Sequence, residues 1–280
     1  MAPSGAKPVE FPVTAINQAD INVIRHGDGA CRVLLIHGSG SAARTFSRLG
    51  EMLVAAVPEC QTHTVSLAGY GSTAADSGAN IIDQHLDVLH AAMGNHRWHV
   101  VGHSMGGFLA LQLALGLAPA DTVINSLSLI EPMAFGALDP VADATALAEE
   151  QAIVAGFENG LQDGSGIAHF IAAWNQTPWH DMPEAAREHL VESAPLIWSE
   201  VQQVSFDTTE LAAYAGLKIP ICLMVGAHTL SPAKAVVSRL STLPRVSSVH
   251  TVEDAGHMHV LRDPQCYAPH IAAHIRQNQH

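Results

Sequence analysis

Basic residues are scarce in this 280-residue sequence. Lys and Arg together number 13 against 26 Asp and Glu, which gives a formal net charge of −13 with His counted as neutral. The few cationic residues form no cluster along the chain, so no stretch offers the positive charge density that a phosphate backbone requires. The composition therefore argues against a nucleic-acid partner.

Long apolar runs are also absent. No run reaches the roughly 18 residues that a membrane-spanning helix needs, and the N-terminal sequence MAPSGAKPVEFPV lacks the apolar core of a secretory signal. The four cysteines are scattered without a C-x-x-C pair, a pattern typical of reduced thiols rather than of a disulfide framework. We therefore expect a cytoplasmic protein with no membrane partner. The sequence does not indicate an oligomeric state.

Patterns for cofactors are missing as well. The 18 histidines are dispersed, and their close pairs lack a third ligand at the spacing of a metal site. No glycine-rich nucleotide fingerprint follows any predicted strand. We therefore predict neither a metal nor an organic cofactor.

Apolar content is high, and its pattern predicts an α/β fold. Hydrophobic residues make up 48% of the chain and charged residues 14%, which excludes a disordered protein. The fully apolar run at residues 33–36 is typical of a strand buried on both faces of a parallel sheet, and further strands are expected at residues 62–67, 123–130, 219–225 and 246–252. Helical patterns separate these runs, which predicts helices on both faces of the sheet. An antiparallel pair of strands at residues 9–13 and 21–25 is expected to open the fold.

Residues 98–114, read as WHVVGHSMGGFLALQLA, give the clearest functional signal. The stretch predicts a strand, a sharp turn at Ser104 and a helix. Gly102 and Gly106 supply the small residues needed where strand and helix nearly touch. Such a turn lifts a serine hydroxyl out of the fold, where a base can activate it. We predict Ser104 as a nucleophile rather than as part of a purely structural turn.

Two further segments extend this pattern to a family resemblance. VLLIHGSG at residues 33–40 and EDAGHMHVL at residues 253–261 occur in the same order around the serine as in the α/β-hydrolase superfamily. Between about residues 20 and 275 the chain resembles its serine esterases and lipases that carry a cap insert. The resemblance implies an α/β-hydrolase core from residues 1–132 and 218–280, and a helical cap from residues 133–217.

The resemblance also implies roles for individual residues. The base would be His257, in the Gly-His segment after the last strand, with His259 as the fallback. The backbone N–H groups of Ser39 and Met105 would form the oxyanion hole. The family usually carries an aspartate where this chain has Ser66, and that departure leaves the chemistry in place.

The acidic member of the triad departs from the common pattern. The family usually places an aspartate three residues after the glycine that closes the penultimate strand, but after Gly226 this chain has Thr229. A minority of the superfamily takes the acid from the end of the strand after the nucleophile helix, where Glu131 stands. We therefore assign Glu131, with Asp254 or a missing acid as the alternatives.

Candidate pocket residues come from two regions of the chain. His37 directly precedes the glycine-rich loop that begins at Gly38, and His103 directly precedes the predicted nucleophile Ser104. Trp174, Trp179 and Trp198 stand in the predicted cap, where tryptophans either pack a small core or line an apolar pocket.

The leading functional hypothesis is an esterase that cleaves a small to medium, largely apolar carboxylic ester through an acyl-enzyme. One alternative is a carbon–carbon bond hydrolase or lyase of the same fold. The cap of such an enzyme usually carries polar or basic groups that bind an acidic substrate, whereas the predicted cap of this chain has only Arg187 as a strong base. A second alternative is a ligand-binding protein that has lost catalysis, because position 229 lacks the usual acid.

Overall fold

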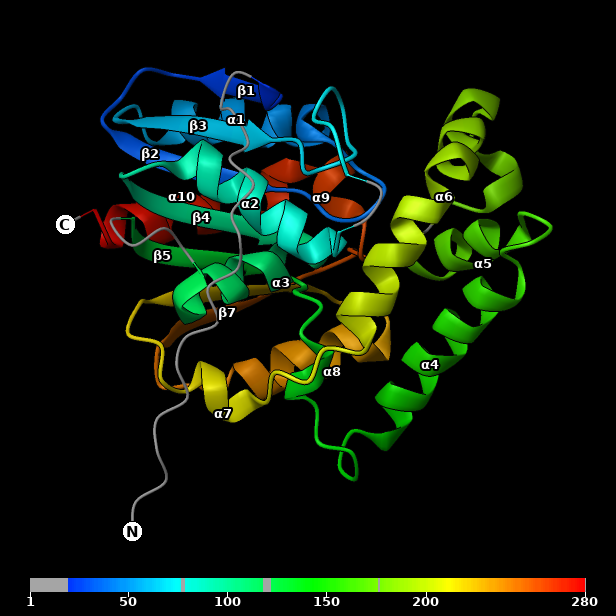
Figure 1. Ribbon diagram of the computed structural model, residues 1–280. Coiled ribbons are helices and arrows are strands. Elements are labelled where there is room, and N and C mark those ends of the chain that lie inside the picture. The colour runs from blue at the N-terminus through cyan, green and yellow to red at the C-terminus, as the bar shows by residue number, and fades with distance from the viewer. Residues whose placement is uncertain (1–19, 77–78, 118–121, 176, 280) are drawn as a thin grey trace, which may run out of the picture.

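The computed structural model describes residues 20–76, 79–117, 122–175 and 177–279. The strand expected at residues 9–13 lies outside the described residues. A central sheet separates two layers of helices, and a further group of helices stands beside the sheet (Figure 1).

The sheet has seven strands in the order β1-β3-β2-β4-β5-β6-β7. All neighbouring pairs are parallel except β1 with β3, which is antiparallel. The predicted mostly parallel sheet is confirmed. The strands are β1 (Val23–His26), β2 (Cys31–Ile36), β3 (Cys60–Val65), β4 (Arg97–His103), β5 (Val123–Ile130), β6 (Ile221–Gly226) and β7 (Val246–Val252).

Helices cover both faces of this sheet (Figure 1). One face carries α1 (Ala43–Ala56) and α10 (Ala268–Gln277), with the short α9 (His259–Arg262) and η5 (Pro264–Cys266) between β7 and α10. The other face carries α2 (Ile81–Met93), α3 (Met105–Gln112), which continues into η2 (Leu113–Leu117), and α8 (Ser231–Leu240).

The apolar run in β2 shows why the strand must be hydrophobic throughout. Val33 and Leu35 pack with α1 and α10, whereas Leu34 and Ile36 pack with the helices of the other face. All four side chains have no exposed surface. Successive side chains of a strand point to opposite faces, so a strand covered on both sides has no position for a polar residue.

The segment between β5 and β6 forms the helices beside the sheet (Figure 1). It contains η3 (Phe135–Ala137), α4 (Ala144–Asn159), α5 (Ser165–Trp174), η4 (Trp179–Asp181), α6 (Glu184–Ser205) and α7 (Leu211–Tyr214). We call α4, α5 and α6 the cap helices. They share a small apolar cluster of their own, which consists of Val154, Phe157, Ile167, Leu190, Ile197 and Val201.

None of the helices in the described part of the chain is long and apolar enough to cross a lipid bilayer.

Candidate active site

Ser104 occupies a strained turn between β4 and α3. Its backbone has φ 57° and ψ −125°, a conformation that is rare for a residue with a side chain. A Cβ atom at Gly102 would lie 2.3 Å from the carbonyl oxygen of Gly106, and one at Gly106 would lie 2.3 Å from that of Ile36. Strand and helix therefore meet backbone against backbone, which explains the glycine two residues before and after the serine.

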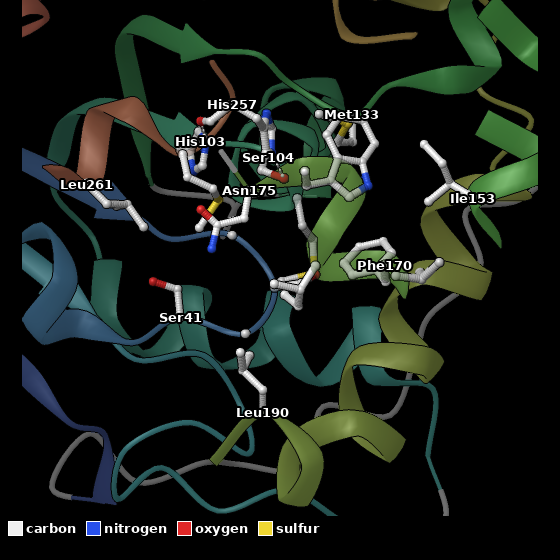
Figure 2. Close-up of a pocket in the computed structure, with 18 of the residues that line it drawn as sticks. Ser41, His103, Ser104, Met133, Ile153, Phe170, Asn175, Leu190, His257 and Leu261 are labelled. Atoms are coloured by element: carbon white, nitrogen blue, oxygen red, sulfur yellow. Dashed lines mark hydrogen bonds between the residues drawn. The ribbon is translucent and has the colours of Figure 1, made fainter. Parts of the chain in front are cut away.

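The structure brings Ser104, His257 and Glu131 into one hydrogen-bonded chain. Nε2 of His257 lies 2.9 Å from Oγ of Ser104, and Nδ1 of His257 lies 2.7 Å from Oε2 of Glu131. Glu131 directly follows β5, His257 stands in the loop between β7 and α9, and both side chains are buried. Figure 2 shows His257 beside Ser104 at one wall of a cavity.

Three donors surround the Glu131 carboxylate. Oε1 accepts the N–H of Gly226 at 2.7 Å, and Oε2 accepts the hydroxyl of Thr229 at 2.6 Å as well as Nδ1–H of His257. Burial acts to raise the pKa of Glu131, but these hydrogen bonds and the nearby His257 outweigh it and hold the pKa below its usual value. The carboxylate is therefore ionised at neutral pH.

Thr229 has a role that the sequence did not reveal. It stands where the family usually places its acid, and here its hydroxyl donates to the acid supplied by β5. The alternative acid, Asp254, is 99% exposed and lies 3.7 Å from His228. The geometry thus favours Glu131 as the partner of His257. The sequence did contain one signal for this role. A residue with a hydroxyl group stands at the usual acid position, from which it can donate a hydrogen bond to an acid supplied by another strand.

The oxyanion candidates Ser39 and Met105 both line the cavity beside Ser104. Gly38 packs directly against the serine, since a Cβ atom there would lie 2.9 Å from Cβ of Ser104. The N–H of Met105 belongs to the first turn of α3, where no helical acceptor precedes it. Within the described residues neither of these two N–H groups has a hydrogen-bond acceptor in the protein.

A cavity of about 550 Å³ lies between the sheet and the cap helices. Ser104, His103 and His257 line it from the core, and Trp174 lines it from the end of α5. The indole of Trp174 lies 4.7 Å from the ring of His257, measured between centroids. The hydrogen-bonded serine therefore faces a cavity of a size suited to a small molecule.

A sequence model of the alpha/beta hydrolase family matches residues 33–267, which contain all three members of the hydrogen-bonded chain. The chain belongs to the alpha/beta hydrolase family.

Two solved structures show the same fold. An esterase from Exiguobacterium antarcticum is 15% identical and has a TM-score of 0.68, with 91% of this chain and 95% of that chain covered. A meta-cleavage product hydrolase from Pseudomonas fluorescens is 16% identical and has a TM-score of 0.67, with 92% and 95% covered. At these identities the likeness concerns the fold alone.

A curated relative matches a shorter stretch. The dihydrolipoyllysine-residue acetyltransferase component of the acetoin cleaving system from Cupriavidus necator is 33% identical over 138 residues. These residues are 45% of this chain and 34% of that protein, so the alignment spans about a third of the relative's length.

Three of the five predicted pocket residues do not line the cavity of this hydrolase. Trp198 packs edge-on against Phe157, with 5.2 Å between ring centroids, and Trp179 packs against the same apolar cluster of the cap helices. Both tryptophans therefore contribute to the core of the cap. His37 is fully buried and is also absent from the cavity wall.

His37 and His103 are neutral structural histidines. Nε2 of His37 accepts the N–H of Leu67 at 3.1 Å, so its proton is on Nδ1 and is donated to the carbonyl of Gly38. Nε2–H of His103 is donated to the carbonyl of His257 at 2.9 Å, which fixes the loop that carries the candidate base. His103 also lines the cavity.

These two histidines predict a loss of stability in mild acid. Burial lowers the pKa of His37 to about 4 and that of His103 to about 3, whereas an unfolded chain binds the proton near pH 6.5. Their contribution is complete above pH 6.5 and is lost as the pH falls toward the folded-state values. We expect the free energy of unfolding to fall by about 4 kcal/mol between pH 8 and pH 5. Urea unfolding at a series of pH values measures this change, and an unaltered midpoint at pH 5 would contradict it.

One group of residues has the composition of a metal site. His259, Asp263 and Cys266 bring potential ligand atoms within 4.8 Å of one another, and no other such group of three occurs in the described residues. All three are half-buried and lie at the surface of α9 and η5, outside the cavity wall. His259, the fallback base, therefore belongs to this cluster, whereas His257 contacts Ser104.

Proposed function

We propose that this protein is a serine hydrolase that cleaves a carboxylic ester with a small to medium, largely apolar acyl group. The observation that carries the proposal is the hydrogen-bonded chain from Ser104 through His257 to Glu131 at the wall of the cavity. The match to the alpha/beta hydrolase family supports a hydrolase. The cavity wall is mostly apolar, which suits an alkyl acyl chain.

The proposed reaction begins at the base. Because Nδ1–H of His257 is directed to Glu131, the free electron pair on Nε2 faces the hydroxyl of Ser104 and can take its proton. Oγ then attacks the ester carbonyl, and the N–H groups of Ser39 and Met105 stabilise the oxyanion. Protonated His257 gives its proton to the leaving alcohol, and water attacks the acyl-enzyme by the reverse use of the same base.

The charge of the cavity wall helps to distinguish an ester hydrolase from the alternative, a carbon–carbon bond hydrolase. Arg44 is the single Arg or Lys among the described residues that line the cavity. Arg187, the strong base noted in the cap sequence, does not line it. A strongly acidic ring-cleavage product, the substrate expected for the alternative enzyme, would therefore meet few cations in this cavity. This favours the hypothesis of an ester hydrolase.

A fluorophosphonate tests the activated serine without a choice of substrate. We expect one covalent adduct per chain on the parent and none on Ser104→Ala, with intact mass as the measurement. Ser39→Ala keeps its backbone N–H and serves as the matched control that still forms the adduct. On a series of 4-nitrophenyl esters from acetate to octanoate, Ser104→Ala should lose about 10⁴-fold or more in kcat/KM. A folded parent that forms no adduct would refute the proposal.

A further inference from the structure

Glu150 places a carboxyl group in an otherwise apolar part of the cavity wall. It lies on α4, is 6% exposed, and lines the cavity together with Ser205 at the end of α6. The hydroxyl of Ser205 donates to Oε1 of Glu150. The apolar residues that line the same cavity include Met133, Phe135, Ile153, Val201 and Val204.

Glu150 accepts fewer hydrogen bonds than the other buried carboxyl groups. The part of the chain that the structure describes buries three such groups, on Glu131, Glu150 and Glu200. Glu131 accepts three hydrogen bonds, and Glu200 accepts one from Tyr70 and one from His85, both at 2.8 Å. Glu150 accepts one, although a carboxylate offers about four acceptor sites.

No cation compensates the Glu150 carboxylate. Its oxygens have no ion-pair partner among the described Lys, Arg and His side chains. Burial therefore raises the pKa of Glu150, and the hydrogen bond from Ser205 offsets only part of this effect. Burying a carboxyl group with unused acceptor sites is unfavourable. A ligand that donates to it would remove this cost.

The position of Glu150 fits the far end of an acyl group. Residues three apart share one face of a helix, so Glu150 lies one turn from Ile153 on the cavity face of α4. Figure 2 shows Ile153 on the opposite side of the cavity from His103 and Leu261, with Ser104 between them. An acyl chain attached to Oγ of Ser104 and directed toward α4 would therefore extend toward the part of the wall that carries this carboxyl group.

We propose that Glu150 and Ser205 form a polar subsite that binds a hydrogen-bond donor at the distal end of the substrate's acyl group. The inference rests on the proposed function and narrows it to esters of hydroxy or amino acids whose polar group is separated from the carbonyl by an alkyl chain. The alkyl chain contacts the apolar wall, and the terminal hydroxyl or ammonium group donates to Glu150.

Three ethyl esters of equal chain length test the subsite: hexanoate, 6-hydroxyhexanoate and 6-aminohexanoate. We expect the parent to favour at least one polar ester over hexanoate by about tenfold or more in kcat/KM. Glu150→Leu should reverse this preference, because an apolar side chain then meets the polar end. Glu150→Gln distinguishes the donors, since it keeps an acceptor for a hydroxyl group but loses the charge that favours an ammonium group.

Glu149→Gln is the matched control, because Glu149 lies on the same helix, is hydrogen-bonded to Ser231 and does not line the cavity. It should keep the parent's order of preference. A parent that hydrolyses hexanoate best, with an unaltered order in Glu150→Leu, would overturn the inference and leave the proposed function standing.

A binding measurement separates the inference from the proposed function. Calorimetric titration of Ser104→Ala with ethyl 6-aminohexanoate and ethyl 6-hydroxyhexanoate requires no turnover. We expect at least one of these esters to bind Ser104→Ala about tenfold or more tighter than it binds the Ser104→Ala, Glu150→Leu double variant. If each ester bound the single and the double variant with equal affinity, the proposed subsite would be overturned. A difference in affinity without any turnover by the parent would support the subsite while refuting the esterase.

Discussion

Glu131→Gln is expected to lower kcat by about 10³- to 10⁴-fold while leaving the fold intact. The amide keeps the size of the side chain but removes the charge that stabilises protonated His257 and can present its NH₂ group to Nδ1. The histidine would then adopt the tautomer whose Nε2 carries a proton and cannot accept one from Ser104. Turnover of the best ester in the series measures the loss, and circular dichroism checks the fold.

Asp254→Asn provides the control for this prediction. It removes a carboxylate of the same loop region that is fully exposed and paired with His228, so we expect activity within about twofold of the parent. If Asp254→Asn lost activity and Glu131→Gln kept it, the assignment of the acid would be wrong.

Gly106→Ala is expected to remove activity and to destabilise the fold by about 3 kcal/mol or more. The added methyl group would lie 2.3 Å from the carbonyl oxygen of Ile36 and 2.6 Å from that of His37. Both obstacles are backbone atoms of the β2 strand and its following loop, so they cannot move aside as a flexible side chain can. Any shift of α3 away from β2 also moves Met105 and Ser104, which stand at its start.

Urea unfolding and fluorophosphonate labelling measure the two effects of Gly106→Ala. Gly216→Ala is the matched control, because the nearest atom to its added methyl group is the carbonyl oxygen of Ala213 at 3.6 Å, an ordinary contact. A Gly106→Ala variant with the parent's urea midpoint and labelling rate would show that strand and helix are not in tight contact at this turn.

Local sequence patterns predicted the alternation of strands and helices and the turn at Ser104, and the family resemblance added the α/β-hydrolase fold and the candidate base His257. An uninterrupted apolar run such as residues 33–36 is typical of a strand covered on both faces, and the structure covers β2 in this way. The glycines around Ser104 indicated the turn because their need for space is local. His257 was assigned because its Gly-His segment after the last strand resembles that of the α/β-hydrolase superfamily.

The expected start of the sheet lies partly outside the described residues, so its pairing with residues 9–13 stays a prediction. Within the described residues β1 pairs with β3 and is antiparallel to it. Pairing of β1 with a strand more than thirty residues later depends on the position of that strand in the finished sheet. No local pattern around β1 carries this information.

The sequence by itself determined the order of strands and helices, the serine turn and the histidine loop, since each depends on residues close together in the chain. Only the tertiary structure decided which carboxylate meets His257, why Thr229 supports it, and which tryptophan faces the cavity. These contacts join residues about a hundred positions apart, and their distances depend on strand register and on how the cap helices pack. Glu150 belongs to this second group, because an acidic residue on a helix becomes a cavity residue only once α4 lies against α6.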